Sequence, residues 1–482
     1  MRTLKQPVKN VKKNTIKKVK TNEGAIAYEH TGNHALEFFS KAGSLFVKKE
    51  SFYRNEMTAL SLFKNVWYAN EELAFKLLLW LRDRNDGAGN RSGFRDCLKW
   101  VAQQPNGTAW IVKNIAWIPA IGRWDDFRCL FDTPAKLACA DFWASKIKEG
   151  DVLAAKWADR KDKPLKHSLN IKEEGEFRRI LATIRRNHIV EHKMSTKQWP
   201  EIEYSKVPSV AMARYTNAFK RNDTDRFESF KQSLIKGETT VKASVLFPHD
   251  CVRTAWAGDS IIADQQFEAL PNYLEGVDER IIVICDTSGS MSVNVAGSVQ
   301  AVDVSQGLAL YCSAKMPQES QFYKKFIGFS CEGKFVDWND YSFSEAVKDR
   351  KIFNGAVGST RIDRALQLIL DTAKFYKLPQ SLIPTTLLIV SDMQFHSGAV
   401  ASNDTEVERE LKKFEEAGYV RPKVVYWNLA GYQGSQDIKD SKNVGLISGF
   451  SPSILKAVFG GEDFSPISIM MRTLEKYKVE RP

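Results

Sequence analysis

The sequence lacks the features that mark membrane, secreted and nucleotide-binding proteins. No apolar run reaches the roughly eighteen residues that cross a bilayer, and no apolar segment follows the basic N-terminus. The seven cysteines are scattered without a CxxC pair, which is typical of free thiols in a reducing compartment. No Walker motif or dinucleotide fingerprint is present. We therefore expect a cytoplasmic protein with no membrane contact.

Positive charge is concentrated in the first part of the chain. The 482 residues are too many for one core, so the length indicates at least two domains. Residues 276–482 hold 24 Lys and Arg against 25 Asp and Glu, whereas residues 1–275 carry a net charge of +13. Such asymmetry favours a polyanionic partner, most often nucleic acid. A basic surface with no specific partner is the alternative.

Residues 1–22 contain eight Lys and Arg and no acid, a pattern that predicts a basic flexible arm. The arm either contacts nucleic acid or is a solvated tail.

Residues 23–275 show the apolar spacing of successive helices. Apolar residues recur every three or four positions over 56–81, with a break at Asn70, so two antiparallel helices are expected there. Similar stretches follow at 94–101, 109–118, 124–130, 134–148 and 177–186. Helix pairs joined by short loops predict an α-helical solenoid of the HEAT or armadillo type.

The spacing of apolar residues changes after Asp278. From there on, apolar strands alternate with helices. Helices are expected over 302–314, 361–376, 404–417 and 453–458, and strands over 281–286, 326–330, 385–392, 424–429 and 444–448. This alternation predicts a doubly wound parallel sheet over residues 276–482. The overall fold class is therefore α followed by α/β.

Hydroxyl and carboxylate side chains follow the ends of these strands. Asp286 and Asp392 each end an apolar strand, Ser288 and Ser290 follow in DTSGS, and Thr360 precedes a helix. Because ligands bind at the carboxyl ends of parallel strands, we expect the five side chains to converge. Hard oxygen ligands without His or Cys favour Mg²⁺ or Mn²⁺. A cation held largely by neutral hydroxyls would seek an acidic residue of a protein partner.

The order DTSGS, loop threonine and strand-end aspartate resembles the metal-ion-dependent adhesion site of von Willebrand factor A domains, over about 200 residues. The resemblance implies that Ser288 and Ser290 ligate the metal directly. It implies that Thr360 does so directly or through water, and that Asp286 and Asp392 act largely through water. A chance DxSxS sequence in a surface turn is the alternative.

The whole chain resembles the Ro/TROVE family of RNA-binding proteins, and more specifically a TROVE-like group of unassigned function that includes phage members. The resemblance lies in LLWLRDRNDGAGNR (78–91), AAKW (154–157), QWPEIEYSKVPSVAMARY (198–215) and LFPHD (246–250). It implies a ring or horseshoe of helical repeats, closed by the A domain, that binds structured or single-stranded RNA in a ribonucleoprotein.

Basic residues near aromatics are the candidates for contacting RNA, because Arg and Lys neutralise phosphates and exposed aromatics stack on bases. They are Arg82, Arg84, Arg91, Arg95, Lys156, Arg160, Lys161, Lys163, Lys166, Arg178, Arg179, Arg185, Arg186, His188 and His192. For each of these residues, the alternative is that it lies on a helix face exposed to solvent and contacts no RNA. We expect the tryptophans at 80, 100, 117, 124 and 157 to lie mostly in the core.

His188, Glu191 and His192 match the HxxEH pattern of zinc peptidases, but a basic helix that contacts RNA suits these histidines better. We predict no enzyme activity and a monomer. Two functions remain open: an RNA-binding scaffold, and a Mg²⁺-dependent module that captures an acidic residue of a protein partner. Salt should weaken the first interaction, and EDTA should abolish the second.

Overall fold

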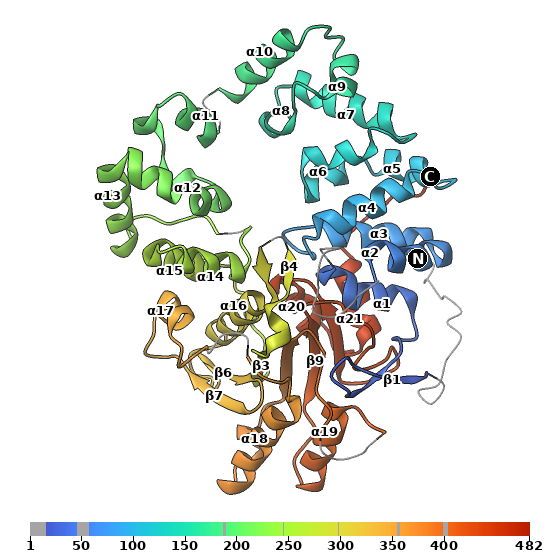
Figure 1. Cartoon of the computed structure of the whole chain (residues 1–482), viewed down its shortest axis with the longest axis vertical. Helices are drawn as coiled ribbons and strands as arrows, with labels where there is room; N and C mark the ends of the chain where they lie inside the picture. Colours follow the sequence, from blue (N-terminus) through green and yellow to red (C-terminus); the bar gives the residue numbers. More distant parts are fainter. Residues whose placement is uncertain are drawn as a thin grey trace.

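The computed structural model describes residues 16–45, 57–186, 189–243, 245–296, 298–353, 357–398 and 403–482. It contains a sheet domain and a helical region (Figure 1). The helices of that region follow a ring-shaped path that leaves the sheet domain and returns to it. His188, a candidate RNA contact, lies outside the described residues.

The sheet domain is built on a six-stranded sheet with a parallel core. The strand order is β10-β9-β8-β3-β6-β7, and every neighbouring pair is parallel except β6 with β7. The expectation of an all-parallel sheet was therefore wrong at this edge, where a short hairpin adds β7. The strands are β3 (Ile281–Asp286), β6 (Lys325–Phe329), β7 (Gly333–Asp337), β8 (Thr386–Ser391), β9 (Lys423–Asn428) and β10 (Val444–Ser448).

Helices cover both faces of this sheet. The helix α16 packs on β3, β6 and β8, and α18 packs on β6 and β7. Strands β3 and β8 are buried along their whole length, which explains their continuous apolar sequences. The remaining elements of the sheet domain are η6 (Gly289–Ser292), β4 (Asn294–Ala296), β5 (Val299–Gln300), α16 (Ala301–Ala314), α17 (Phe343–Lys348), α18 (Ile362–Phe375), η7 (Gln380–Leu382), α19 (Glu406–Glu416), η8 (Pro452–Ile454), α20 (Leu455–Phe459) and α21 (Pro466–Leu474).

The helical region consists of short helices joined by short loops. The expected break at Asn70 is present: it ends the first helix, and its side chain accepts a hydrogen bond from the Leu73 amide to cap the next. The stretch at 124–130 forms a 3₁₀ helix instead of an α-helix. The elements are α2 (Ala59–Ala69), α3 (Glu71–Arg82), α4 (Arg91–Val101), α5 (Gly107–Lys113), α6 (Trp117–Ile121), η3 (Trp124–Leu130), α7 (Lys136–Lys148), α8 (Val152–Trp157), α9 (Lys163–Ser168), α10 (Glu174–Arg185), α11 (Val190–Ser195), η4 (Trp199–Glu201), η5 (Tyr204–Lys206), α12 (Ser209–Asn222), α13 (Thr224–Ile235), α14 (Pro248–Trp256) and α15 (Ser260–Glu268).

Both ends of the helical region pack on the sheet domain. At one end α3 contacts α21, and at the other α14 contacts α16 and α17. Gly307 of α16 permits the second contact, because a Cβ there would lie 2.8 Å from the backbone nitrogen of His249. The helical path is therefore closed through the sheet domain (Figure 1).

The N-terminal segment packs on the sheet domain as well as on the first helices of the helical region, which corrects two expectations. Residues 18–20, expected in a flexible arm, form strand β1 (Lys18–Lys20), which pairs with β2 (Ile26–Tyr28). The following helices, α1 (His34–Lys41) and η2 (Ala42–Ser44), pack on the sheet as well as on α2 of the helical region. Phe38 and Phe39 of α1 are fully buried, so apolar burial holds this segment in place. Residues 1–15 lie outside the described residues.

Across the described residues, every helix is too short or too polar to cross a membrane.

Candidate functional site

The five residues predicted to hold a cation come from the loops that follow β3 and β8 and from the loop before α18, which meets the end of β6 because the Arg361 amide donates to the Ser330 carbonyl. The turn after β3 is held by its own hydrogen bonds: the Ser288 amide donates to Oδ1 of Asp286 at 2.9 Å, and the Ser288 and Ser290 hydroxyl oxygens are 3.2 Å apart. The loop with Thr360 is tied to this turn, because the Gly289 amide donates to the Gly358 carbonyl at 3.0 Å. Thr360 itself is buried.

Gly358 is required for this approach of the two loops. Its φ is +78°, and a Cβ at this position would lie 2.6 Å from Sγ of Cys331. Any larger residue would be strained and would push the Thr360 loop away from the Ser288 turn.

Asp286 and Asp392 are completely buried at the centre of this arrangement. Oδ2 of Asp286 accepts a hydrogen bond from the Ser391 hydroxyl at 2.5 Å, and Oδ1 of Asp392 accepts one from the Gln394 amide at 3.0 Å. Oδ2 of Asp392 makes no direct hydrogen bond within the described part of the chain, although the nearby Ser290 hydroxyl contributes to lowering the pKa of this carboxyl group. A buried carboxylate oxygen without a donor is unfavourable unless a ligand compensates it.

The electrostatics of the two carboxyl groups also favour a ligand that compensates their charge. Burial raises the pKa of both, and the negative charge of Asp392 raises the pKa of Asp286 further. A divalent cation would favour the ionised forms of both groups. Among the described residues no three His, Cys, Asp or Glu side chains converge as a metal-binding group, so a cation here would depend on the hydroxyls of Ser288, Ser290 and Thr360. Hydroxyl and carboxylate oxygens suit Mg²⁺ or Mn²⁺.

Several candidate RNA contacts are engaged inside the protein instead. Arg82 is 4% exposed and bonds Asp126 at 2.7 Å, so its assignment to an RNA surface was wrong. The others are partly exposed, but each is held by an intramolecular partner. Arg84 pairs with Asp250, Arg95 with Asp125 and Asp126, Lys156 with Glu191, Lys166 with Glu174, and Arg185 donates to the carbonyls of Ala155 and Ala158.

Other candidates remain available to a ligand. Seven basic side chains are exposed and make no ion pair with any described residue. They are Arg91, Arg160, Lys161, Lys163, Arg178, Arg179 and Arg186. All but Arg91 lie around α9 and α10, so positive charge is concentrated along one arc of the helical path (Figure 1).

Arg91 lies beside a group of arginines that the sequence did not reveal as a unit. Arg123 donates to both carboxylate oxygens of Asp125, at 3.0 and 2.9 Å, and its guanidinium carbon lies 4.0 Å from the centroid of the Trp157 ring. Burial and the positive charge of Arg123 both lower the pKa of Arg91. We call the following set the arginine cluster: Arg82, Arg91, Arg95 and Arg123, with Asp125 and Asp126.

The arginine cluster has four guanidinium groups against two carboxylates. Neighbouring guanidinium groups repel one another, so the excess charge favours an anionic ligand. Trp157 is half-buried: Arg128 donates to its backbone carbonyl at 2.6 Å, and the Arg123 guanidinium lies over its ring. The cluster lies on α3, α4 and the beginning of η3, and Trp157 is the last residue of α8. The sequence reasoning placed Trp157 mostly in the core and did not single out Arg123, because the two residues become neighbours only through folding.

The HxxEH pattern does not form a zinc site around its glutamate. Both carboxylate oxygens of Glu191 lie within 3.1 Å of Nζ of Lys156, and Tyr215 donates to Oε1 at 3.3 Å. These hydrogen bonds contribute to lowering the pKa of Glu191 against the opposing effect of burial. His192 is partly exposed on α11. A lysine in contact with the carboxylate disfavours a dication at the same place.

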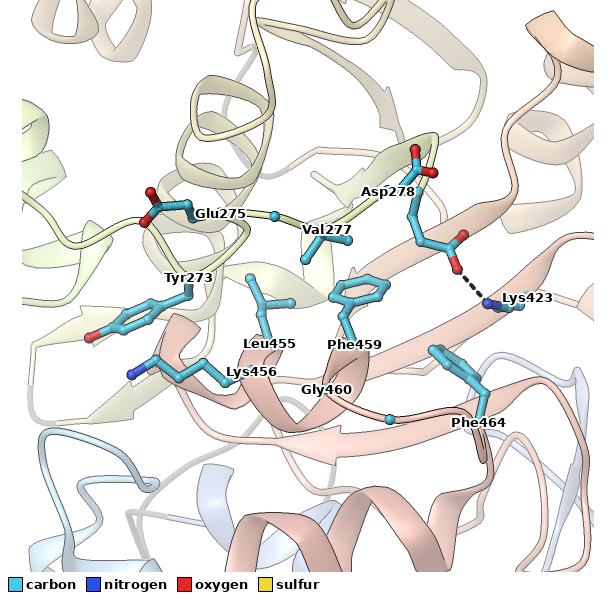
Figure 2. A pocket seen from close by; sticks show the side chains of 13 residues that line it. Tyr273, Glu275, Val277, Asp278, Lys423, Leu455, Lys456, Phe459, Gly460 and Phe464 are labelled. Atoms are coloured by element: carbon cyan, nitrogen blue, oxygen red, sulfur yellow. Dashed lines mark hydrogen bonds and ion pairs between the residues drawn. The ribbon is translucent and has the colours of Figure 1, made fainter.

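A separate cavity of about 410 Å³ lies near the amino ends of β3 and β9 (Figure 2). Lys423 pairs with Glu279 in its wall, and Nζ of Lys456 lies 4.9 Å from the centroid of the Tyr273 ring. Both lysines thus have interaction partners within the protein. The cavity is at the opposite edge of the sheet from the cation site, and we assign no ligand to it.

Two family models match the chain, one on each side of residue 280. A domain of unknown function, DUF2828, matches residues 144–281, and a second, DUF7788, matches residues 280–480. Neither description names a catalytic activity.

Two further similarities extend over nearly the whole chain. An uncharacterized protein of Acanthamoeba polyphaga mimivirus is 25% identical over 517 aligned positions, which cover 95% of this chain and 87% of the relative. The crystal structure of the Deinococcus radiodurans RO (RSR) protein is 14% identical, with a TM-score of 0.37, over 92% of this chain and 99% of that one.

Proposed function

We propose that this protein is a non-enzymatic scaffold that binds single-stranded or structured RNA on its helical region. The observation that carries the proposal is the arginine cluster with the adjoining Trp157. Arg82 is buried, so the charge for a phosphate would come from Arg91, Arg95 and Arg123, and the indole of Trp157 beside Arg123 would supply a stacking surface for a base. The exposed cations around α9 and α10 would extend this surface along the RNA backbone. The net charge of +13 in residues 1–275 agrees with a polyanionic ligand.

The test is fluorescence anisotropy with a labelled single-stranded oligouridine. Replacing Arg91 and Arg123 together by Gln should raise the Kd about tenfold, because two charge-assisted phosphate contacts are lost. Lys374→Gln is the matched control, since Lys374 is exposed at the end of α18, far from the helical path. Equal affinity of the double variant and wild type would remove the arginine cluster from the RNA site. Failure of wild type to bind any RNA would refute the proposed function.

We further propose that the loops after β3 and β8, together with the loop before α18, hold one Mg²⁺ or Mn²⁺. Ser288, Ser290 and Thr360 would supply hydroxyl oxygens, and Asp286 and Asp392 would supply charge, largely through water. Oδ2 of Asp392, buried without a donor among the described residues, supports the proposal. The bound cation would supply a positive centre for an acidic group of a protein partner.

The cation proposal is tested by thermal unfolding in EDTA and in Mg²⁺. Wild type should unfold at a higher temperature in Mg²⁺, because a ligand that binds the folded state stabilises it. Asp286→Ala should remove this difference while leaving the helical region folded. The same Mg²⁺-dependent shift in wild type and variant would refute the assignment.

A further inference from the structure

Four apolar side chains are exposed at the end of the sheet domain that lies farthest from the helical region, where α18 and α19 end (Figure 1). They come from the end of α18, from η7 and from the turn after α19. We call them the apolar patch: Phe375 is 79% exposed, Tyr376 67%, Leu382 42% and Val420 68%. The rings of Phe375 and Tyr376 contact each other edge to face, with centroids 4.9 Å apart. Exposed apolar side chains that gather in one place mark a surface that another molecule covers.

Hydrogen bonds hold the three segments of the apolar patch together. The Tyr419 hydroxyl donates to the carbonyls of Ala373 and Leu378, at 3.1 and 3.2 Å. The Val420 amide donates to Oε1 of Gln380 at 2.9 Å, and α18 packs on α19. The backbone that carries the exposed side chains is thus fixed before any partner binds, which lowers the entropic cost of association.

Exposed charges flank the apolar patch, with opposite signs at the ends of the two helices. Lys374 and Lys377 lie at the end of α18, whereas Glu415 and Glu416 are the last two residues of α19. All four side chains are exposed, and none makes an ion pair with a described residue. The two glutamates also lie at the negative end of the α19 dipole, so a cation from outside the chain would stabilise them.

We propose that the apolar patch is the contact between two copies of this chain related by a two-fold axis. In a two-fold contact each surface meets its own copy, so the lysines of one chain can lie beside the glutamates of the other. The apolar side chains would meet at the centre, inside a charged rim, as in other protein interfaces. The monomer expected from the sequence would then be the form present at low concentration only.

The signs of the flanking charges favour a second copy over an anionic surface. A lipid membrane or a nucleic acid would attract the lysines at the end of α18 but would repel the glutamates at the end of α19. The contact also leaves the helical region accessible, because the apolar patch lies at the opposite end of the molecule (Figure 1). The proposal is therefore independent of the RNA and cation proposals above.

The test is sedimentation velocity of the full chain over a range of concentrations. Wild type should form dimers with a Kd of about 10 µM, because a small apolar contact gives weak association. Phe375→Ser should raise this Kd at least about tenfold, since the most exposed ring of the contact is lost. Tyr68→Ser is the matched control: it removes a ring that is 74% exposed on α2, and it should dimerise as wild type does. Wild type that stays monomeric up to about 100 µM, or equal dimerisation of Phe375→Ser and wild type, would overturn the proposal.

Charge reversal tests whether the second molecule is a copy of this chain. Replacing Lys374 and Lys377 by Glu, or Glu415 and Glu416 by Lys, should abolish the dimer, because both flanks then carry the same sign. A mixture of the two variants should form a heterodimer, since each chain offers the sign that the other lacks. Failure of the mixture to associate would overturn the proposal, and so would dimers of both variants as stable as those of wild type.

Cosedimentation with vesicles of phosphatidylserine and phosphatidylcholine separates a second copy from a lipid surface. Wild type and Phe375→Ser should be found in the pellet to the same extent, because the apolar patch would not contact lipid. Pelleting of wild type that is lost in Phe375→Ser would assign the apolar patch to a lipid surface and overturn the proposal.

Discussion

The Arg84 guanidinium donates a hydrogen bond to Oδ2 of Asp250 at 2.8 Å and lies 4.6 Å from the centroid of the Phe247 ring. Arg84 follows α3, near the beginning of the helical region, and Asp250 is in α14, near its end. The pair therefore fastens the two ends of the helical path to each other, where both meet the sheet domain. Asp250 also accepts a hydrogen bond from the Phe247 amide, so the same carboxylate caps α14.

Replacement of Arg84 by Ala should destabilise this junction. The variant loses the ion pair, the contact with Phe247 and a hydrogen bond to the Val245 carbonyl at 3.1 Å. Because the Arg84 side chain is partly exposed, we expect a loss of about 1–2 kcal/mol in the free energy of unfolding. Urea unfolding would measure it. Arg160→Ala, at an exposed residue with no ion pair to the described residues, should change stability by less than about 0.5 kcal/mol.

Asp392→Asn should have opposite effects on stability in EDTA and in Mg²⁺. Without a cation, removing one of two adjacent buried negative charges should raise Tm by roughly 1–3 °C. With Mg²⁺, the variant should lack the stabilisation seen in wild type. Differential scanning fluorimetry in both buffers would measure the two effects. A lower Tm in EDTA would indicate that Asp392 is stabilising on its own, contrary to a ligand-binding role.

His249 should make the protein less stable as the pH falls from about 6.5 towards 4. Burial lowers the pKa of His249 to about 4 in the folded protein, whereas 6.5 is its ordinary value. Between these values the unfolded chain binds a proton that the folded protein does not, so acid favours unfolding. Between pH 7 and pH 5 this residue should cost about 1–2 kcal/mol. His249→Leu should reduce that pH dependence, and an unchanged slope in urea unfolding would exclude a neutral buried imidazole.

Lys156 and Glu191 should show a modest coupling energy. The pair joins α8 to α11 and is partly exposed, so a double-mutant cycle should give about 0.5–1 kcal/mol.

Because Lys156 contacts the carboxylate of the HxxEH pattern, Zn²⁺ should not raise Tm of wild type. A Zn²⁺-dependent increase that disappears in Glu191→Gln would instead support a metal at this motif.

The salt dependence of RNA binding should separate phosphate contacts from stacking. Replacing Arg178 and Arg179 by Glu should weaken oligouridine binding and lower the slope of log K against log salt by roughly 0.7 for each lost phosphate contact. Trp157→Ala should weaken binding by about 1–3 kcal/mol while leaving the slope unchanged. Anisotropy titrations at three salt concentrations would measure both. Identical slopes for all variants would exclude the exposed face of α10 from the RNA site.

The candidate cation site could be predicted from the sequence because its residues follow strands with a clear apolar pattern. Strand β3 has the predicted bounds, and the predicted five residues come from loops at one edge of the sheet. Ser391 was missed, although its hydroxyl donates to Asp286, because a serine inside a strand carries no separate signal. The cation itself stays a prediction.

The helical region was less predictable because its ion pairs join distant residues. Arg82 and Asp126 are 44 positions apart, and no local pattern showed that this arginine is buried. Strand β1 was missed for a similar reason: its three residues lie in a lysine-rich segment, and its position depends on pairing with β2 and on contacts with the sheet domain. The expectations of RNA binding, cytoplasmic location and a monomer also stay predictions.

The burial of α1 on the far strands of the sheet has a consequence for synthesis of the protein. The Ser448 hydroxyl donates to the Phe39 carbonyl, a contact between residues 409 positions apart. At 5–20 residues per second, the ribosome needs roughly 20–80 s to make the strand that covers α1 after α1 itself has emerged. Phe38 and Phe39 can pack on Phe63 and Trp80 of α2 and α3 soon after α1 is made, but the face of α1 that contacts β9 and β10 stays uncovered for that time. We expect nascent chains that stop before β10 to depend on a chaperone that the finished protein does not need.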